Sequence, residues 1–91
     1  MDNRSQEFLA KAKDILKKIT FSGGEGYIIG PSVLKIINEE NLDNITIYIN
    51  LEERLMYELF KDYNIIKISE GIYQLGYLGF TYDILTDKSL Q

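Results

Sequence analysis

The stretch Gly26–Ile47, GYIIGPSVLKIINEENLDNITI, decides the expected fold. It begins with a short apolar run that is typical of a buried strand. Gly30 and Pro31 follow, and proline at a first helical position gives up no hydrogen bond that the helix needs. Apolar residues then recur at helical spacing, and the segment Asn44–Asn50 alternates isoleucine with polar residues. We therefore predict a strand, a short helix ending near Asn38, and a second strand.

The flanking segments add two longer helices. From Asn3 onward, apolar residues recur every three or four positions and predict a helix of about four turns. After the second strand, Asn50 followed three residues later by Glu53 resembles a capping box, which is typical of a helix start. We expect this third helix to run to about Asp62.

The C-terminal third contains three apolar segments, Ile65–Ser69, Ile72–Tyr77 and Phe80–Leu85. The tight turns Glu70-Gly71 and Leu78-Gly79 separate them, which predicts an antiparallel meander. The strands on either side of the short helix form a crossover unit, which predicts that these two strands are parallel.

The predicted fold class is α+β. It is a single small domain over residues 1–91, with a mixed sheet of about five strands, helices on one face, and the order α-β-α-β-α-β-β-β. Residues 1–6 and 86–91 are expected to fray.

Composition limits the chemistry. The chain has 91 residues, no cysteine and no histidine, which excludes thiol and imidazole catalysis and zinc or iron–sulfur sites with N or S ligands. Its formal net charge of −4 disfavours nucleic acid as a partner. No apolar run approaches the ~20 residues that span a membrane. We therefore expect a cytoplasmic protein, and the abundance of Ile, Lys, Asn and Tyr suggests a bacterial or phage source.

Two glycine-containing loops are candidate anion sites. The loop Ser22–Gly26 precedes a strand and lacks the Gly-Lys-Ser/Thr ending of a phosphate-binding loop, so a plain flexible loop is expected. Gly30-Pro31-Ser32 joins a strand to a helix, where backbone N–H groups could attract an anion. Proline removes one of those donors, so a purely structural turn is the other interpretation.

The stretch Gly26–Ile47 resembles the signature of the nucleotidyltransferase head domain of tRNA CCA-adding enzymes and bacterial poly(A) polymerases. That signature is an apolar pair, Gly-Gly-x-Val-Arg-Asp-Leu-Leu, a short spacer, and Asp-apolar-Asp-apolar. Gly30 matches the first glycine and Val33 the valine, while Ile36 and Ile37 match the paired leucines. A later strand of that family carries a further acidic residue, which corresponds to Asp83.

The positions that carry chemistry in this family differ here. The second glycine is Pro31, the Arg-Asp pair is Leu34 and Lys35, and the two metal-binding aspartates are Asn44 and Thr46. The family uses two divalent ions held by carboxylates, and neutral side chains do not replace that charge. The resemblance therefore implies a retained fold without catalysis, metal or cofactor.

Alternation supports the same alignment. Asn44, Thr46 and Tyr48 should share the sheet face that is opposite the isoleucines, together with Thr81, Asp83 and Leu85. Tyr73, Leu75 and Tyr77 also share one side of their strand. They either fill the core or form an aromatic surface for a partner.

Three functional hypotheses follow. The first is a catalytically inactive nucleotidyltransferase-like module that binds or regulates an unknown protein, as a monomer or as a homodimer through a sheet edge. The second is a small-ligand (nucleotide) sensor that uses the Gly30 junction. The third is a residual enzyme in which acids of the segment 39–43 join Asp83 as makeshift ligands. The candidate site positions are Gly30, Pro31, Ser32, Asn44, Thr46 and Asp83.

Overall fold

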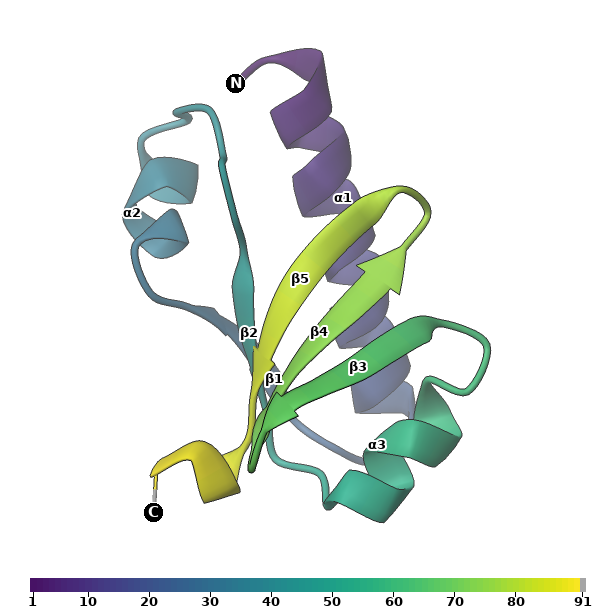
Figure 1. The fold of residues 1–91 in the computed structure, drawn as a ribbon. Helices are drawn as coiled ribbons and strands as arrows, with labels where there is room; N and C mark the ends of the chain where they lie inside the picture. The colour runs from purple at the N-terminus through teal and green to yellow at the C-terminus, as the bar shows by residue number, and fades with distance from the viewer. Residues whose placement is uncertain (91) are drawn as a thin grey trace.

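A computed structural model of the protein describes residues 1–90 and the side chains of residues 1–88. Within these residues, each of three α-helices is followed by a strand, and two further strands precede a terminal 3₁₀ turn (Figure 1). The helices are α1 (Asn3–Phe21), α2 (Ser32–Ile37) and α3 (Glu53–Leu59); the strands are β1 (Gly26–Ile29), β2 (Thr46–Ile49), β3 (Asn64–Ser69), β4 (Ile72–Tyr77) and β5 (Phe80–Leu85); the turn is η1 (Asp87–Leu90). The strands form one mixed sheet in the order β1-β2-β5-β4-β3. The predicted fold class is confirmed.

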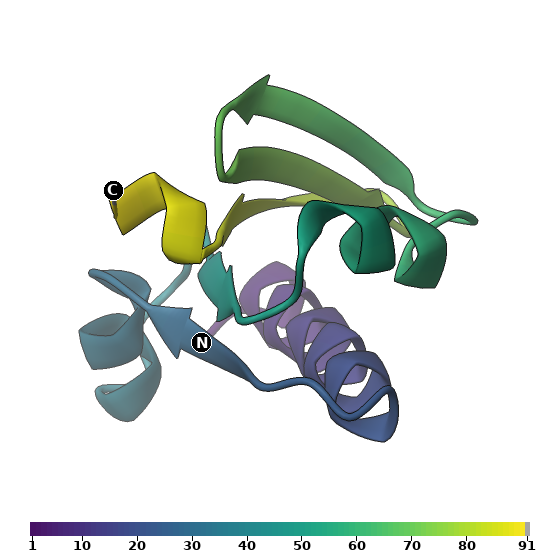
Figure 2. The same ribbon diagram turned by 90° about the horizontal axis from the view of Figure 1, so that it is seen from below.

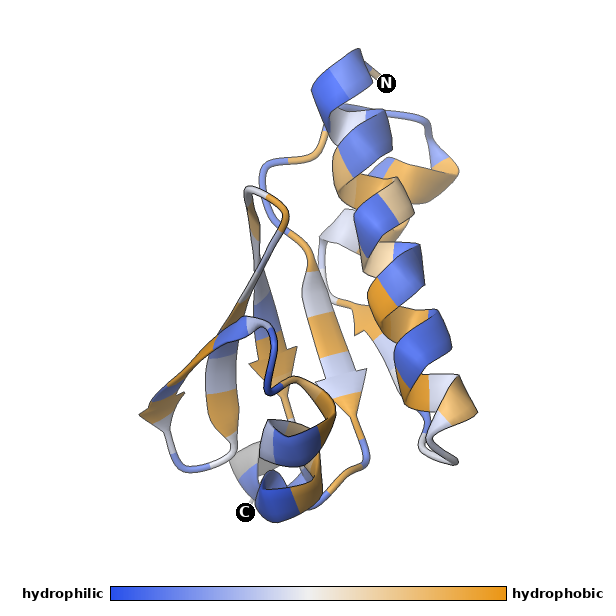
Figure 3. Cartoon of the chain, turned by 90° about the vertical axis from the view of Figure 1, so that its right-hand side faces the viewer, coloured by the Kyte–Doolittle hydropathy of each residue, from blue (hydrophilic) through white to orange (hydrophobic). Residues whose placement is uncertain are grey.

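The core lies between α1, α3 and one face of the sheet. Apolar residues of α1 pack against the sheet, and the rings of Phe8 and Tyr82 are 4.9 Å apart. The Tyr82 hydroxyl donates to the Phe8 carbonyl at 2.7 Å, which satisfies the one polar atom of that buried side chain. Met56 and Phe60 contribute from α3. Figure 3 shows the alternation of apolar and polar residues along the strands that makes this face apolar.

The alternation predicted for β2, β4 and β5 is confirmed. Tyr82 and Ile84 are buried on the core face, and Tyr73 and Leu75 join them. Tyr73 and Leu75 of β4 therefore fill the core, and Tyr77 is half-buried against it, which favours the core interpretation of that strand. The three last strands form the expected antiparallel meander.

The predicted parallel pairing of the first two strands is wrong. β1 and β2 are antiparallel, and β2 pairs in parallel with β5 instead. The crossover rule applies to a helix that packs across a sheet face, and α1 already occupies the core face. The six-residue α2 lies beside the N-terminal part of α1, where the Met1 amino group donates to the Glu39 carbonyl at 2.8 Å (Figure 1). The chain reverses there, and β2 returns along β1.

The predicted capping box of the third helix is also wrong. The N-cap residue of α3 is Glu52, and it makes no side-chain capping bond. The Asn50 side chain instead accepts from the Glu25 backbone N–H at 2.7 Å, which joins the entrance of β1 to the end of β2. The Glu53 carboxylate points to the sheet, where the Tyr73 hydroxyl donates to it at 2.9 Å. Both side chains serve tertiary contacts, so α3 is shorter than expected.

Hydrogen bonds involve residues near both ends of the chain, where fraying is expected. Asp2 caps α1 by accepting from the Ser5 N–H at 2.7 Å, and the buried Ser5 hydroxyl accepts from the Leu42 N–H at 2.8 Å. At the other end, the Thr86 backbone and hydroxyl both donate to the Gly71 carbonyl. The expectation for Gln91 lies outside the described residues. Within residues 1–90, no helix has the length and apolarity needed to cross a membrane.

Candidate functional site on the open sheet face

The sheet face opposite α1 and α3 carries the candidate site, and we call it the open face. Figure 2 shows the two helices on one side of the sheet and η1 on the other. Strand pairing and alternation place the following side chains on this face: Tyr27 and Ile29 of β1, Thr46 and Tyr48 of β2, Thr81, Asp83 and Leu85 of β5, Ile72 and Gln74 of β4, and Ile66 of β3.

The register brings three of the candidate elements together. Thr46 pairs with Ile29 on one side and with Asp83 on the other. The Asp83 N–H donates to the Ile45 carbonyl at 3.1 Å, which fixes β5 beside β2 at this point. Gly30 directly follows Ile29, so the positions of the family's glycine and of its second and third acidic residues lie on adjacent strands. Asn44 lies two residues before Thr46 and is exposed.

The turn at Gly30 joins β1 to α2 and has the conformation and hydrogen bonds of a structural turn. Gly30 has a φ of +80°, a conformation that glycine adopts without strain. Its carbonyl accepts from the Val33 N–H at 3.1 Å. Ser32 is only 4% exposed, and its hydroxyl donates to the Ile29 carbonyl at 3.4 Å. Ser32 therefore supports the turn from inside, and Pro31 has no N–H to offer a ligand.

Carboxylates are sparse around Thr46. Asp83 is half-buried, and neither neighbouring candidate position is acidic. The acids of the third hypothesis lie in the loop after α2, where Lys35 forms a salt bridge with Asp43 at 3.1 Å. Among the described residues, no group of three or more acidic side chains is close enough to hold a metal ion.

Two stacked tyrosines form a feature that the sequence interpretation missed. The rings of Tyr27 and Tyr48 lie 6.3 Å apart with an interplanar angle of 15°. The Tyr27 hydroxyl donates to the Glu25 carboxylate at 2.9 Å, and the Tyr48 hydroxyl donates to the Asp87 carboxylate. These hydrogen bonds raise the pKa of both tyrosines, with the nearby negative charge adding to the effect. The alternation of β2 had placed Tyr48 on this face, but the antiparallel β1 partner was needed to find Tyr27.

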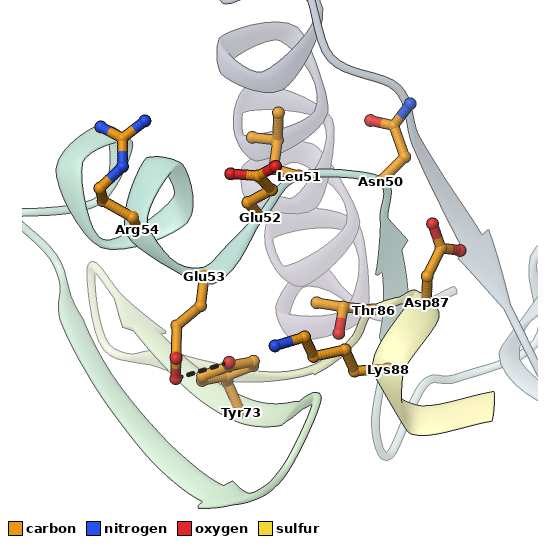
Figure 4. Close-up of a pocket in the computed structure, with 9 residues that line it drawn as sticks. All are labelled: Asn50, Leu51, Glu52, Glu53, Arg54, Tyr73, Thr86, Asp87 and Lys88. Carbon is orange, nitrogen blue, oxygen red and sulfur yellow. Dashed lines mark hydrogen bonds between the residues drawn. The ribbon is translucent and has the colours of Figure 1, made fainter. Parts of the chain in front are cut away.

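A separate cleft of about 470 Å³ lies at the carboxyl ends of the parallel strands β2 and β5 (Figure 4). Ligands of open α/β sheets often bind at such an end. The residues that line it are Asn50, Leu51, Glu52, Glu53, Arg54, Tyr73, Thr86, Asp87 and Lys88. Neither Gly30, Thr46 nor Asp83 is among them.

Most polar groups that line this cleft are engaged in hydrogen bonds or ion pairs, mainly with residues outside its lining. Lys67 contacts Glu53 at 2.9 Å and Glu70 at 3.0 Å, and Lys88 contacts Glu70 at 3.3 Å. The bond from Lys67, followed by that from Tyr73, lowers the pKa of Glu53. Burial, followed by the bond to Glu53, raises the pKa of Tyr73 to about 12. This network joins α3 to the meander, so a structural role accounts for these side chains.

The fold and the open face together define an α+β domain with a five-stranded mixed sheet covered by helices on one face. No protein-family model matches the chain, and no curated protein matches its sequence. The likeness to nucleotidyltransferase head domains therefore rests on the motif Gly26–Ile47 and on Asp83 of β5.

Proposed function

We propose that this protein is a catalytically inactive nucleotidyltransferase-like module that acts by binding another protein. The observation that carries the proposal is the row Ile29–Thr46–Asp83 across β1, β2 and β5. It places Thr46 beside Asp83, with Gly30 directly after Ile29, although these positions, which the motif alignment assigned to one site, are up to 53 residues apart in the chain (83 minus 30). A chance match in sequence would not be expected to converge on adjacent strands.

The side chains in this row do not support metal-dependent transfer. Two-metal catalysis requires several anionic oxygens on both ions, and Thr46 and Asn44 supply none. Asp83 is the single carboxylate that the alignment retains. The net charge of −4 also opposes the approach of polyphosphates and nucleic acid. A protein is the partner class that remains compatible with an acidic, partly apolar sheet face.

The alternative function, a nucleotide sensor at the Gly30 junction, has less support from the geometry. Phosphate sites at strand-to-helix turns use free backbone N–H groups and often a hydroxyl. Here Pro31 lacks the N–H, and the Ser32 hydroxyl is buried against Ile29. We therefore favour protein binding, and we place the module in the cytoplasm because it has none of the disulfides that usually stabilise small secreted domains.

A nucleotidyl transfer assay tests the proposal. The wild-type protein is incubated with Mg²⁺, an RNA primer and each of the four nucleoside triphosphates, and incorporation is compared with that of Asp83→Ala. We expect both proteins to give the same background incorporation. Mg²⁺-dependent transfer by the wild type that Asp83→Ala abolishes would overturn the proposal, since Asp83 would then hold a catalytic metal.

A further inference from the structure

We propose that the open face binds a cationic segment of a protein partner, with a lysine or arginine side chain resting on the Tyr27–Tyr48 pair. This inference rests on the proposed binding function and names the chemistry of the partner. It is carried by the exposure of the sheet face, by the acids around the tyrosines, and by the pairing of the nearby lysines with other acids.

The open face is only partly covered. Tyr27 is 52% exposed and Ile66, at the far edge of the sheet, is 51% exposed. The register continues from Tyr27 through the half-buried Tyr48, Leu85 and Ile72. Ile66 lies in the adjacent row, opposite Gln74. An aromatic and aliphatic row that begins at an exposed tyrosine, with another exposed apolar side chain in the adjacent row, is typical of a surface that another chain covers.

The strand side chains of the open face and the two acids bound to its tyrosines carry only negative charge. Glu25 and Asp87 hold the two tyrosine hydroxyls, and Asp83 lies in the next row. Among the residues whose side chains are described, Asp83 makes no salt bridge. An anionic ligand would meet three carboxylates here, whereas a cationic one would meet complementary charge.

The nearby lysines do not neutralise these carboxylates. Lys67 of β3 contacts Glu53 and Glu70, and Lys88 of η1 also contacts Glu70. Lys35 of α2 contacts Asp43. These three lysines therefore pair with acids other than the three carboxylates of the proposed site. The partner has to supply the positive charge.

The Tyr27–Tyr48 pair offers a specific binding position for the partner's positive charge. A guanidinium or ammonium group is attracted to the face of an aromatic ring within about 6 Å of its centroid. Hydrogen bonding of each hydroxyl to a carboxylate increases the electron density of the ring, and the same carboxylates lie beside it. The aliphatic stem of a lysine or arginine can then cover Leu85 and Ile72.

A ¹⁵N amide NMR titration with a blocked peptide of four Arg-Gly repeats tests this inference, with the matching Glu-Gly peptide as the charge control. We expect saturable shifts at Tyr27, Tyr48 and Asp83 with the cationic peptide alone, and weaker binding as the salt concentration rises. Tyr27→Leu should weaken binding by about two- to fivefold. Tyr57→Leu, which alters an exposed tyrosine of α3, should leave it unchanged.

Shifts confined to other acidic residues, or equal affinity for the wild type and Tyr27→Leu, would overturn the inference. Its failure is distinguishable from failure of the proposed function. If the protein transfers no nucleotide and does not bind the peptide, only this inference fails. Mg²⁺-dependent transfer would overturn the proposed function, whether or not the peptide binds.

Discussion

Replacing Asn44 and Thr46 with aspartate is expected to create a divalent-cation site that the natural sequence lacks. Thr46 lies beside Asp83 in the sheet register, and Asn44 precedes it by two residues on the same expected face. The double variant would therefore gather three carboxylates where the wild type has one. Carboxylate oxygens suit Mg²⁺ and Mn²⁺. We expect a dissociation constant for Mn²⁺ on the order of 10⁻⁴ to 10⁻³ M, in the range of weak carboxylate sites.

Isothermal titration calorimetry with Mn²⁺ measures this change against the wild type. The matched control adds Asp83→Asn to the double variant, which removes the third carboxylate and should weaken binding at least tenfold, about 1.4 kcal/mol. A folded double variant that binds Mn²⁺ no better than the wild type would contradict the motif alignment, because the aligned positions would then not converge on one site.

Replacing Ile47 with alanine is expected to remove much of the stability of the domain. Ile47 is fully buried on the core face of β2, and its neighbours in the sheet are Ile28 and Ile84. Large-to-small changes at such positions cost about 2–5 kcal/mol, out of the roughly 5–15 kcal/mol that holds a domain of this kind together. Urea unfolding followed by circular dichroism gives the change in the free energy of unfolding.

Thr46→Ala is the matched control on the adjacent residue. Its side chain faces the open side, so we expect a loss below about 1 kcal/mol. If Ile47→Ala does not fold, Ile47→Val, with an expected cost of about 0.5–1.5 kcal/mol, keeps the comparison measurable. A larger loss at Thr46 than at Ile47 would mean that the two faces of β2 are exchanged, as a one-residue slip in register would cause.

Sequence periodicity correctly predicted the elements that do not depend on a tertiary partner. Helical spacing placed α1, and period-two alternation assigned the faces of β2 and β5, so that Thr46 and Asp83 were expected on the same face. The tight turns at Gly71 and Gly79 set the meander, since a two-residue turn leaves adjacent strands antiparallel. These features are local, and local chemistry determines them.

The direction of β1 relative to β2 could not be predicted, because it depends on whether α1 or α2 covers the core face of the sheet. A helix between two strands usually crosses the sheet, but α2 has six residues and α1 is longer and richer in buried apolar groups. Leu34 and Ile37 of α2 are consequently 66% and 68% exposed. The sequence marks α2 as amphipathic without indicating that α1 excludes it from the core.

Side chains with two possible roles account for the other differences. Asn50 could cap α3 or accept from Glu25, and the second role prevails because it joins two strands. Glu53 could complete the capping box or bind Lys67 and Tyr73. The Tyr27–Tyr48 pair depends in turn on the antiparallel register of β1 and β2. The candidate site was therefore predictable around Thr46 and Asp83, whereas its aromatic part was not.

The most direct test of the central claim, a binding module without a nucleotide site, is a ¹⁵N amide NMR titration of the wild-type protein with ATP and CTP in the presence of Mg²⁺. The account predicts a well-dispersed spectrum that does not respond to either nucleotide. Saturable shifts that gather at Gly30, Ser32, Thr46 and Asp83 would contradict it and would place a nucleotide site at the junction of β1 and α2.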